Sequence, residues 1–269
     1  MIRVRSIHLY PVKATGPVDV DSARVELEGL RHDRRWAVVD PDGVRLSAST
    51  HDRLLSATAT PDAGGALTLT GPGLAPLQVA VPVNGPHIAV DVSRLPTMVD
   101  AGDEAAAWFG RLLGEPARLV WQDDPTRRPI SMEHGGLGAE PLNLADTGPL
   151  LLTTTSSLSQ LEAWIAEDHE PQTMVMRRFR PNVVVDGSEV PFAEDGWRGI
   201  RIGDVPYRFA EHCDRCVVTT IDPLTLAHGK EPIRTLARHR KWDGKTWFGI
   251  RIVPLATGTI AVDDEVTVA

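Results

Sequence analysis

The sequence predicts an α+β fold in which short β-strands predominate and helices flank them. Runs of alternating apolar and polar residues recur through the first hundred residues and again after Arg180, separated by turns rich in Gly and Pro. Between these regions lie segments whose apolar residues recur at helical spacing. Short strands at this spacing are typical of a small barrel or sandwich. We place one domain boundary near residue 100, which gives domains 1–100 and 101–269.

The N-terminal strands are expected between recognisable turn signals. Residues 3–10 alternate and stop at Pro11, and residues 36–39 run into the turn Asp40-Pro41-Asp42-Gly43. Because alternation places one face of a strand toward a core, these segments are expected to be half-buried strands. Further strands are expected at residues 18–27, 66–69 and 78–83.

Two helices are expected in the middle of the chain. Residues 103–113 begin with acidic residues, carry an apolar stripe and end before Gly114, a C-cap residue. A second helix is expected to begin near Ser156. The loop 123–149 is longer than most connections, which favours a site-forming role. After Arg180 the pattern returns to strands, at residues 182–185, 199–202, 207–209, 217–221 and 258–268.

Composition excludes several classes of protein. The 269 residues contain 28 Lys and Arg against 36 Asp and Glu, a formal net charge of −8, which disfavours a general nucleic-acid binder. No apolar run approaches the roughly 20 residues of a membrane helix, and the basic start lacks the apolar stretch of a signal peptide. We therefore expect a cytoplasmic protein with no membrane partner. Two cysteines make a disulfide framework unlikely.

The two cysteines, Cys213 and Cys216, form a C-x-x-C pair that four interpretations fit. Zinc would want a second pair of ligands, and a thioredoxin-type redox pair would sit at the start of a helix, whereas residues 217–221 look like a strand. Two buried apolar cysteines are the plainest alternative. The fourth interpretation is a thiolate ligand to a soft metal, favoured by the positive field of Arg208, His212 and Arg215.

Residues 213–223 resemble the C-x-R-C-x-x-T-T-x-D-P signature of MOSC proteins (molybdenum cofactor sulfurase C-terminal domain). Residues 10–13 resemble the Y-P-V-K opening of the β-barrel domain that precedes MOSC domains, and residues 29–36 its G-L-x-x-D-R-x-W. Together these segments span most of the chain in order, and the pattern is similar to the mitochondrial amidoxime-reducing components and their bacterial counterparts. Further matching segments lie at 179–185, 191–197, 231–236 and 258–264.

The resemblance implies an N-terminal β-barrel-like domain packed on a C-terminal MOSC β-barrel domain with flanking helices. It implies a molybdenum–pterin cofactor (Mo-molybdopterin), rather than pyridoxal phosphate, with Cys216 as metal ligand and catalytic residue. Cys213 receives no ligand role. The residues on family positions near the cofactor, or with hydroxyls beside a helix start, are Lys13, Arg34, Asp146, Thr154, Ser157, Arg180 and Asn182.

The implied reaction is reduction of N-hydroxylated compounds such as amidoximes, hydroxylamines or N-oxides. A separate ferredoxin- or flavoprotein-like donor would supply the electrons, because the chain has no dinucleotide-binding turn and too few cysteines for an iron–sulfur cluster. The alternative is a sulfur or cofactor carrier that uses Cys216 as persulfide or ligand. A domain that keeps the fold without the metal is a third interpretation. The chain departs from the family pattern at Ala14, often Ser in relatives, and at Ser49, often Arg.

Overall fold

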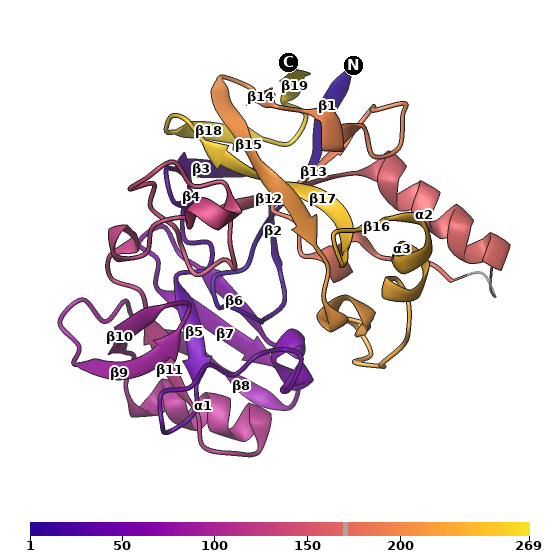
Figure 1. The fold of residues 1–269 in the computed structure, drawn as a ribbon. Helices are drawn as coiled ribbons and strands as arrows, with labels where there is room; N and C mark the ends of the chain where they lie inside the picture. Colours follow the sequence, from indigo (N-terminus) through magenta and orange to yellow (C-terminus); the bar gives the residue numbers. More distant parts are fainter. Residues whose placement is uncertain (169–171) are drawn as a thin grey trace.

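The computed structural model describes residues 1–168 and 172–269, and its centre is a closed β-barrel (Figure 1). The strands of the ring pair antiparallel, except that β12 and β13 are parallel. Pairing of β17 with β12 closes the ring, so none of its strands keeps an open edge there. Around the ring, the described strands are β12 (Leu150–Thr154), β13 (Val183–Asp186), β1 (Ile2–Leu9), β19 (Glu265–Val268), β14 (Gly199–Ile202), β15 (Val205–Asp214) and β17 (Lys245–Pro254).

Alternation along the strands gives the barrel its core. In β14, Ile200 and Ile202 are buried while Arg201 between them is exposed, the period of two that a half-buried strand requires. The interior is filled mainly by branched aliphatic side chains such as Val4, Val185 and Ile250. Two short strands extend the sheet: β2 (Val18–Val20) pairs with β1, and β16 (Lys241–Trp242) pairs with β17.

A second unit lies below the barrel in Figure 1 and has its own core. Helix α1 (Asp103–Leu113) has the predicted bounds and ends at Gly114 in the left-handed conformation, with φ 81°. It packs Trp108 and Phe109 against small sheets. The strands of this unit are β5 (Trp36–Val39), β11 (Arg118–Trp121), β10 (Leu95–Asp100) and β9 (His87–Val92) in one sheet, and β6 (Thr58–Pro61), β7 (Leu67–Gly71) and β8 (Leu74–Val79) in another.

No single boundary in the sequence separates the barrel from the second unit. The N-terminal β1 and β2 belong to the barrel, while α1 and β11, which follow residue 100, belong to the second unit. A small sheet of β18 (Gly258–Ala261), β3 (Ser22–Glu26) and β4 (Gly29–Leu30) also joins the two ends of the sequence. The domain boundary near residue 100 stays a prediction.

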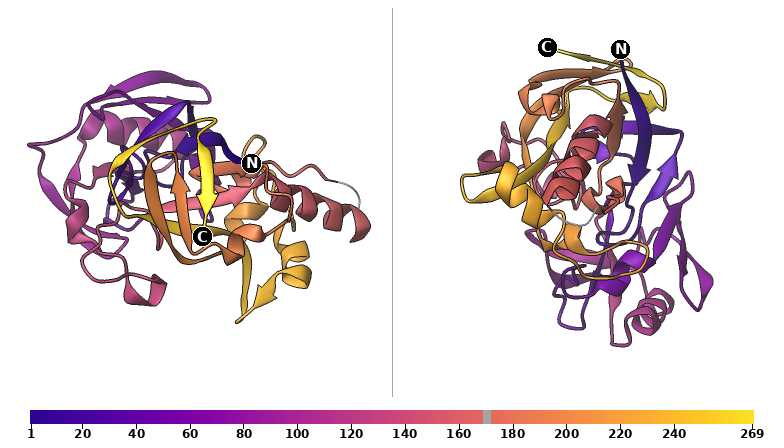
Figure 2. Two further views of the ribbon diagram at one scale, coloured as in Figure 1. Left: turned by 90° about the horizontal axis from the view of Figure 1, so that it is seen from above. Right: turned by 90° about the vertical axis from the view of Figure 1, so that its right-hand side faces the viewer.

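Helices α2 (Thr155–Asp168) and α3 (Ile233–His239) flank the barrel on one side, as the two views of Figure 2 show. Leu161 and Ile165 of α2 pack against Leu236 and Phe248, so the apolar face of this helix is buried. The predicted α+β class with flanking helices is confirmed. Short 3₁₀ helices complete the fold: η1 (Asp52–Ser56), η2 (Pro125–Arg127), η3 (Met132–His134), η4 (Met176–Phe179), η5 (Ala193–Gly196) and η6 (Val217–Thr220).

One predicted strand is wrong. The β-branched run after Cys216 forms the 3₁₀ helix η6 because hydroxyls, not a neighbouring strand, satisfy its backbone. Thr219 donates to the carbonyl of Cys216 through its amide at 3.1 Å and its hydroxyl at 2.9 Å. Thr220 donates its hydroxyl to the carbonyl of Val217 at 2.8 Å.

Among the described residues, no helix is both long and apolar enough to cross a membrane.

Candidate functional site

A cavity of about 360 Å³ lies where the barrel meets the second unit. Its walls come from the turn after β1, the loop after β5, the loop before β12, the segment after η4 and the end of β15. Among the described residues, its lining carries seven basic side chains and two acidic ones, Asp146 and Asp214, in a chain of net charge −8. The lining is therefore positively charged overall, which favours an anionic ligand. The basic residues are Lys13, Arg34, Arg45, Arg178, Arg180, Arg215 and Arg251.

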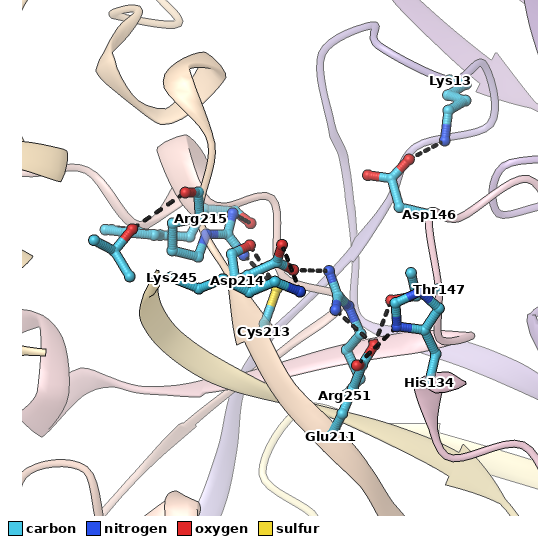
Figure 3. Close-up of polar contacts among 12 residues, drawn as sticks. Lys13, His134, Asp146, Thr147, Glu211, Cys213, Asp214, Arg215, Lys245 and Arg251 are labelled. Carbon is cyan, nitrogen blue, oxygen red and sulfur yellow. Dashed lines mark hydrogen bonds and ion pairs between the residues drawn. The ribbon is translucent and has the colours of Figure 1, made fainter. Parts of the chain in front are cut away.

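Lys13 and Asp146 form an ion pair on one wall (Figure 3), with Nζ and Oδ1 2.6 Å apart. The ammonium group also donates to the carbonyl of Leu144 at 2.6 Å. Burial lowers the pKa of Lys13 to about 8, although Asp146 opposes that shift. In turn, Lys13 holds the pKa of Asp146 well below its usual range. Both predicted residues thus lie at the cavity, already paired with each other.

Arg34 and Arg180 lie against the same aromatic ring. Their guanidinium carbons are 4.6 and 4.3 Å from the ring centre of Tyr10, within cation–π range. Both residues have left-handed backbones, with φ of 48° and 55°, a conformation that costs free energy in non-glycine residues. Arg180 also donates to the carbonyl of Thr15 at 2.6 Å. The fold therefore holds two cations in fixed positions at the cavity.

Asn182 holds Arg34 in place. Its side-chain oxygen accepts from Arg34 Nη1 at 3.0 Å and from the amide of Leu151 at 3.2 Å. Its Nδ2 donates to the carbonyl of His8 and to buried Asp33. Because these bonds engage both ends of the amide, Asn182 lines the cavity mainly as a brace that links β1 to β12.

Cys216 is exposed and lies at the N-terminus of η6, directly after β15. The carbonyl of Cys216 receives both bonds from Thr219 described above, so the two threonines of the signature fix the turn that presents its thiol. A strand after Cys216 would be inconsistent with a thioredoxin-type redox pair, but residues 217–220 form a 3₁₀ helix and not a strand. Four residues of 3₁₀ helix nevertheless provide little dipole to stabilise a thiolate.

The Asp-Pro at the end of the signature has a role in the same turn. Arg178 is buried, and its Nη2 lies 2.6 Å from Oδ2 of Asp222. Asp222 also accepts backbone amides of Leu224 and Thr225 at 3.0 Å each. Asp222 thus holds a cavity arginine and closes the loop that follows Cys216.

Cys213 is buried at the cavity wall, and its sulfur accepts from Arg215 Nη1 at 2.7 Å (Figure 3). Arg251 spans two carboxylates beside it, Glu211 at 2.7 Å and Asp214 at 3.0 Å. In Figure 3 this network lies apart from the Lys13–Asp146 pair. The two groups of charges therefore form separate walls of the cavity.

Unpaired donors test whether the cavity fits an anionic cofactor. The Nε atoms of Arg178 and Arg215 are buried and, in the described part of the chain, have no hydrogen-bond partner. Buried guanidinium donors without an acceptor are costly, so an acceptor at the cavity would satisfy them. Together with the surplus of positive charge and the exposed thiol of Cys216, they fit a group that carries a phosphate and a soft metal.

Thr154 and Ser157 do not lie at this cavity. Both are fully buried, and Ser157 donates to Oε1 of Glu194 at 2.8 Å, while Thr154 donates to Oε2 at 3.2 Å. Burial raises the pKa of Glu194 despite these bonds. The sequence predicts Thr154 and Ser157 as cofactor contacts. In the structure their hydroxyls, at the start of α2, hydrogen-bond to the Glu194 carboxyl of η5 instead.

The sequence prediction missed three cavity cations, Arg45, Arg178 and Arg251. They lie in a loop, in a 3₁₀ helix and in the middle of β17, so no local pattern joins them. The only local signal was the basic run Arg177-Arg178-Phe179-Arg180 beside the F-R-P-N motif.

Comparison with known proteins accounts for most of the chain. Residues 1–116 match the family described as MOSC N-terminal beta barrel domain, and residues 139–267 match the MOSC domain. Human mitochondrial amidoxime-reducing component 1 is 32% identical over 98% of this chain, which covers 82% of that protein. Molybdenum cofactor sulfurase from Danio rerio is 30% identical over 91% of this chain, but the chain spans only 31% of its length. Rat mitochondrial amidoxime reducing component 2 is 32% identical, again over 98% of this chain and 82% of that protein.

Proposed function

This chain belongs to the MOSC family, and from that membership we propose that it binds a molybdenum–pterin cofactor through Cys216 and reduces N-hydroxylated compounds. Similarity to amidoxime-reducing components over nearly the whole chain supports the reaction class. The observation that carries the proposal is a cationic cavity in an acidic chain, with one exposed thiol at its edge.

The cofactor, when bound, supplies two-electron oxygen-atom chemistry at a metal ligated by the Cys216 thiolate. The chain's own residues bind and orient it. Arg180 and Lys13 would neutralise its phosphate, and Asn182 would keep Arg34 aimed at the same wall. The free Nε donors of Arg178 and Arg215 would take acceptors near the thiol. Reduction of an amidoxime to an amidine consumes two electrons and two protons and releases water.

The electrons would come from a separate protein, ferredoxin- or flavoprotein-like. The sequence carries no dinucleotide-binding turn and only two cysteines, so neither a nicotinamide nor a four-thiolate cluster has a binding motif in it. An artificial donor can therefore replace the partner in a test.

The test supplies cofactor-loaded protein with benzamidoxime and a reduced viologen dye. We expect amidine formation that requires the dye, and loss of both molybdenum and activity in Cys216→Ser. Cys213→Ser is the matched control, because it removes a thiol from the same cavity and should keep most of the metal. Equal metal loss in both variants, or full metal in Cys216→Ser, would contradict the ligand assignment.

A second candidate function is transfer of sulfur or of the cofactor itself. The similarity to a molybdenum cofactor sulfurase favours it, as does the position of Cys213 in the same cavity wall as Cys216. Absence of amidine formation, together with a persulfide on Cys216 in mass spectrometry, would support this candidate over the reductase.

A further inference from the structure

The proposed reduction needs two protons for each N–O bond broken, and the cavity carboxylates are poor sources for them. Lys13 lowers the pKa of Asp146. Asp146 is paired with Lys13 at 2.6 Å and Asp214 with Arg251 at 3.0 Å, so both cavity carboxylates are engaged as ion-pair partners. Neither is placed to serve as the acid. This inference rests on the proposed function and concerns where its protons come from.

A continuous line of hydrogen bonds connects the cavity to an imidazole outside it. Ser47 and Ser49 line the cavity, and their hydroxyl oxygens are 2.7 Å apart. Ser47 Oγ lies 3.1 Å from Thr50 Oγ1, which lies 2.8 Å from His51 Nδ1. At the far end, His51 Nε2 is 2.7 Å from Oε1 of Glu115. Every link is within hydrogen-bonding distance, so the line has no gap.

The backbone fixes this line. The amides of Thr50 and His51 both donate to the carbonyl of Ser47, at 3.1 and 2.8 Å, which makes a tight turn. Ala48, inside the turn, is buried against Val218 and Ile221, the residues that follow Cys216. The hydroxyls are thereby held against the turn that presents the thiol, although they come from the other packing unit.

The line ends at the open side of the cavity. Of the lining residues, Arg45, Ser49, Asp146 and Cys216 are exposed, whereas the cations Lys13 and Arg34 are buried. The open side is therefore where a substrate meets Cys216. Of these four exposed residues Ser49 alone carries a hydroxyl, so it is the one placed to give a proton to a substrate bound beside Cys216.

We propose that Ser49, Ser47, Thr50 and His51 form a relay that delivers both protons of the reduction from solvent to the N–O group of the substrate. Doubly protonated His51 holds one proton on Nε2, bonded to Glu115, and one on Nδ1, directed at Thr50. Ser49 gives its hydroxyl proton to the departing oxygen while Ser47, Thr50 and His51 each pass one proton along. The hydroxyls then rotate back, and His51, whose side chain is 25% exposed, takes a new proton from solvent.

The relay transfers a proton twice for each N–O bond that is broken. The N–O bond breaks with two electrons that the donor protein supplies. One relayed proton converts the departing hydroxyl group to water, and the second protonates the nitrogen, which becomes the N–H of the amidine or amine. The charged groups around His51 are Glu115 after α1, Asp52 and Arg53 of η1, and His228, which contacts Asp52 at 2.7 Å.

The experiment compares Thr50→Val with Thr50→Ser in the cofactor-loaded protein. Valine keeps the shape of threonine but removes the hydroxyl, so kcat should fall about 100-fold, the usual value of a proton-transfer group, with KM unchanged. Serine keeps the hydroxyl and should rescue kcat to within a few fold. His51→Ala should lose activity similarly and regain part of it with added imidazole. Ser56→Ala is the matched control, because Ser56 donates only to the carbonyl of Arg53 outside the cavity.

A second measurement does not depend on turnover. In ¹⁵N NMR of the metal-free protein, neutral His51 should carry its proton on Nε2 in the wild type and in Thr50→Ser. In Thr50→Val the proton should stay on Nε2, which Glu115 holds, but the ¹⁵N shift of Nδ1 should move toward that of a ring nitrogen without a hydrogen-bond donor. Equal kcat in Thr50→Val and the wild type, or an unchanged Nδ1 shift in Thr50→Val, would overturn the relay. A wild type that does not turn over N-hydroxylated compounds would count against the proposed function instead.

Discussion

Lys13 is the cavity cation whose charge is most sensitive to pH, since burial lowers its pKa to about 8. The sign of the effect follows directly: the ammonium is charged below that pH and attracts phosphate, and it becomes neutral as the pH rises. We therefore expect the affinity for inorganic phosphate to fall between pH 8 and 9.5, where the charge of phosphate itself stays constant. Bound phosphate opposes the loss of the proton, so the decline begins near pH 8 and levels off only above the higher pKa of Lys13 in the complex.

Isothermal titration of the wild type across that pH range measures this prediction. Lys13→Arg keeps its charge throughout, because a guanidinium does not lose its proton there. Its affinity should therefore stay level. A parallel decline in both proteins would show that another group controls binding.

Removal of Arg34 would leave a buried carboxylate without its ion-pair partner, whereas removal of Arg180 would not. Arg180 donates to a carbonyl, so Arg180→Ala removes positive charge without stranding an ion. Arg34 pairs with Asp33, whose carboxylate is fully buried and also accepts from the amide of Tyr10 at 2.7 Å. Breaking a buried pair from one side costs about 3–5 kcal/mol.

We accordingly expect Arg180→Ala to lower pterin content while unfolding at nearly the same urea concentration as the wild type. Arg34→Ala should lose both pterin and stability. Fluorescence of the oxidised pterin and urea unfolding separate the two effects. Full pterin content in Arg180→Ala would remove that residue from the cofactor site.

At the scale of elements, closure of the barrel depends on Gly249 in β17. Its backbone has φ 77°, and an added Cβ would lie 2.7 Å from Cγ2 of Thr153 and 2.8 Å from the carbonyl oxygen of Leu152, both in β12. The glycine therefore lets the two strands that close the ring approach each other. Gly249→Ala should lower the free energy of unfolding by about 3 kcal/mol, through backbone strain together with overpacking.

Gly244 is a matched control for this prediction. It has nearly the same backbone, with φ 74°, but an added Cβ meets nothing within 4 Å. Gly244→Ala should therefore cost only the strain, about 1 kcal/mol. Urea denaturation of both variants measures the difference. An equal loss of unfolding free energy in the two variants would mean that the clash with β12 adds nothing to the cost of Gly249→Ala.

The sequence predicted elements well where a single local cause decides the structure. Helix α1 has acidic residues, an apolar stripe and a terminal glycine, and its bounds agree with the prediction. Prediction failed after Cys216, where the β-branched run favours a strand but threonine hydroxyls bond to carbonyls of the same turn. Local sequence also failed to predict the partner of Thr154 and Ser157. Their hydroxyls bond to Glu194, which comes from a distant segment of the chain.

The candidate site was predictable only in part for the same reason. Motifs pointed to Cys216, Lys13, Arg34, Asp146, Arg180 and Asn182, and the structure brings all of them to one cavity. Their roles as cofactor contacts stay predictions. Arg178 and Arg251 reach the cavity through tertiary packing alone. The line from Ser49 to Glu115 was equally invisible, because its last link crosses from a loop to the end of a helix 64 residues away.

For the whole molecule, the distribution of charge matters more than its total. The chain is acidic overall, yet its cavity lining carries seven basic and two acidic side chains. An acidic exterior repels acidic partners at long range, while the cavity attracts small anions at short range. Association with an electron-donor protein of like charge should therefore accelerate with added salt, and binding of a phosphate-bearing ligand should weaken.

The barrel also joins segments that are far apart in the sequence and are therefore made at different times. Strand β1 pairs with β19, with Ile2 opposite Val266. A ribosome adds roughly 5–20 residues per second, so the first strand waits on the order of 10–50 seconds for its neighbour. The second unit, by contrast, is complete once β11 has emerged. A nascent chain would thus hold one folded unit beside an unpaired strand, and Cys216 would join Lys13 only late in translation. Insertion of any ligand into this cavity therefore has to wait until the segment that carries Cys216 has been made.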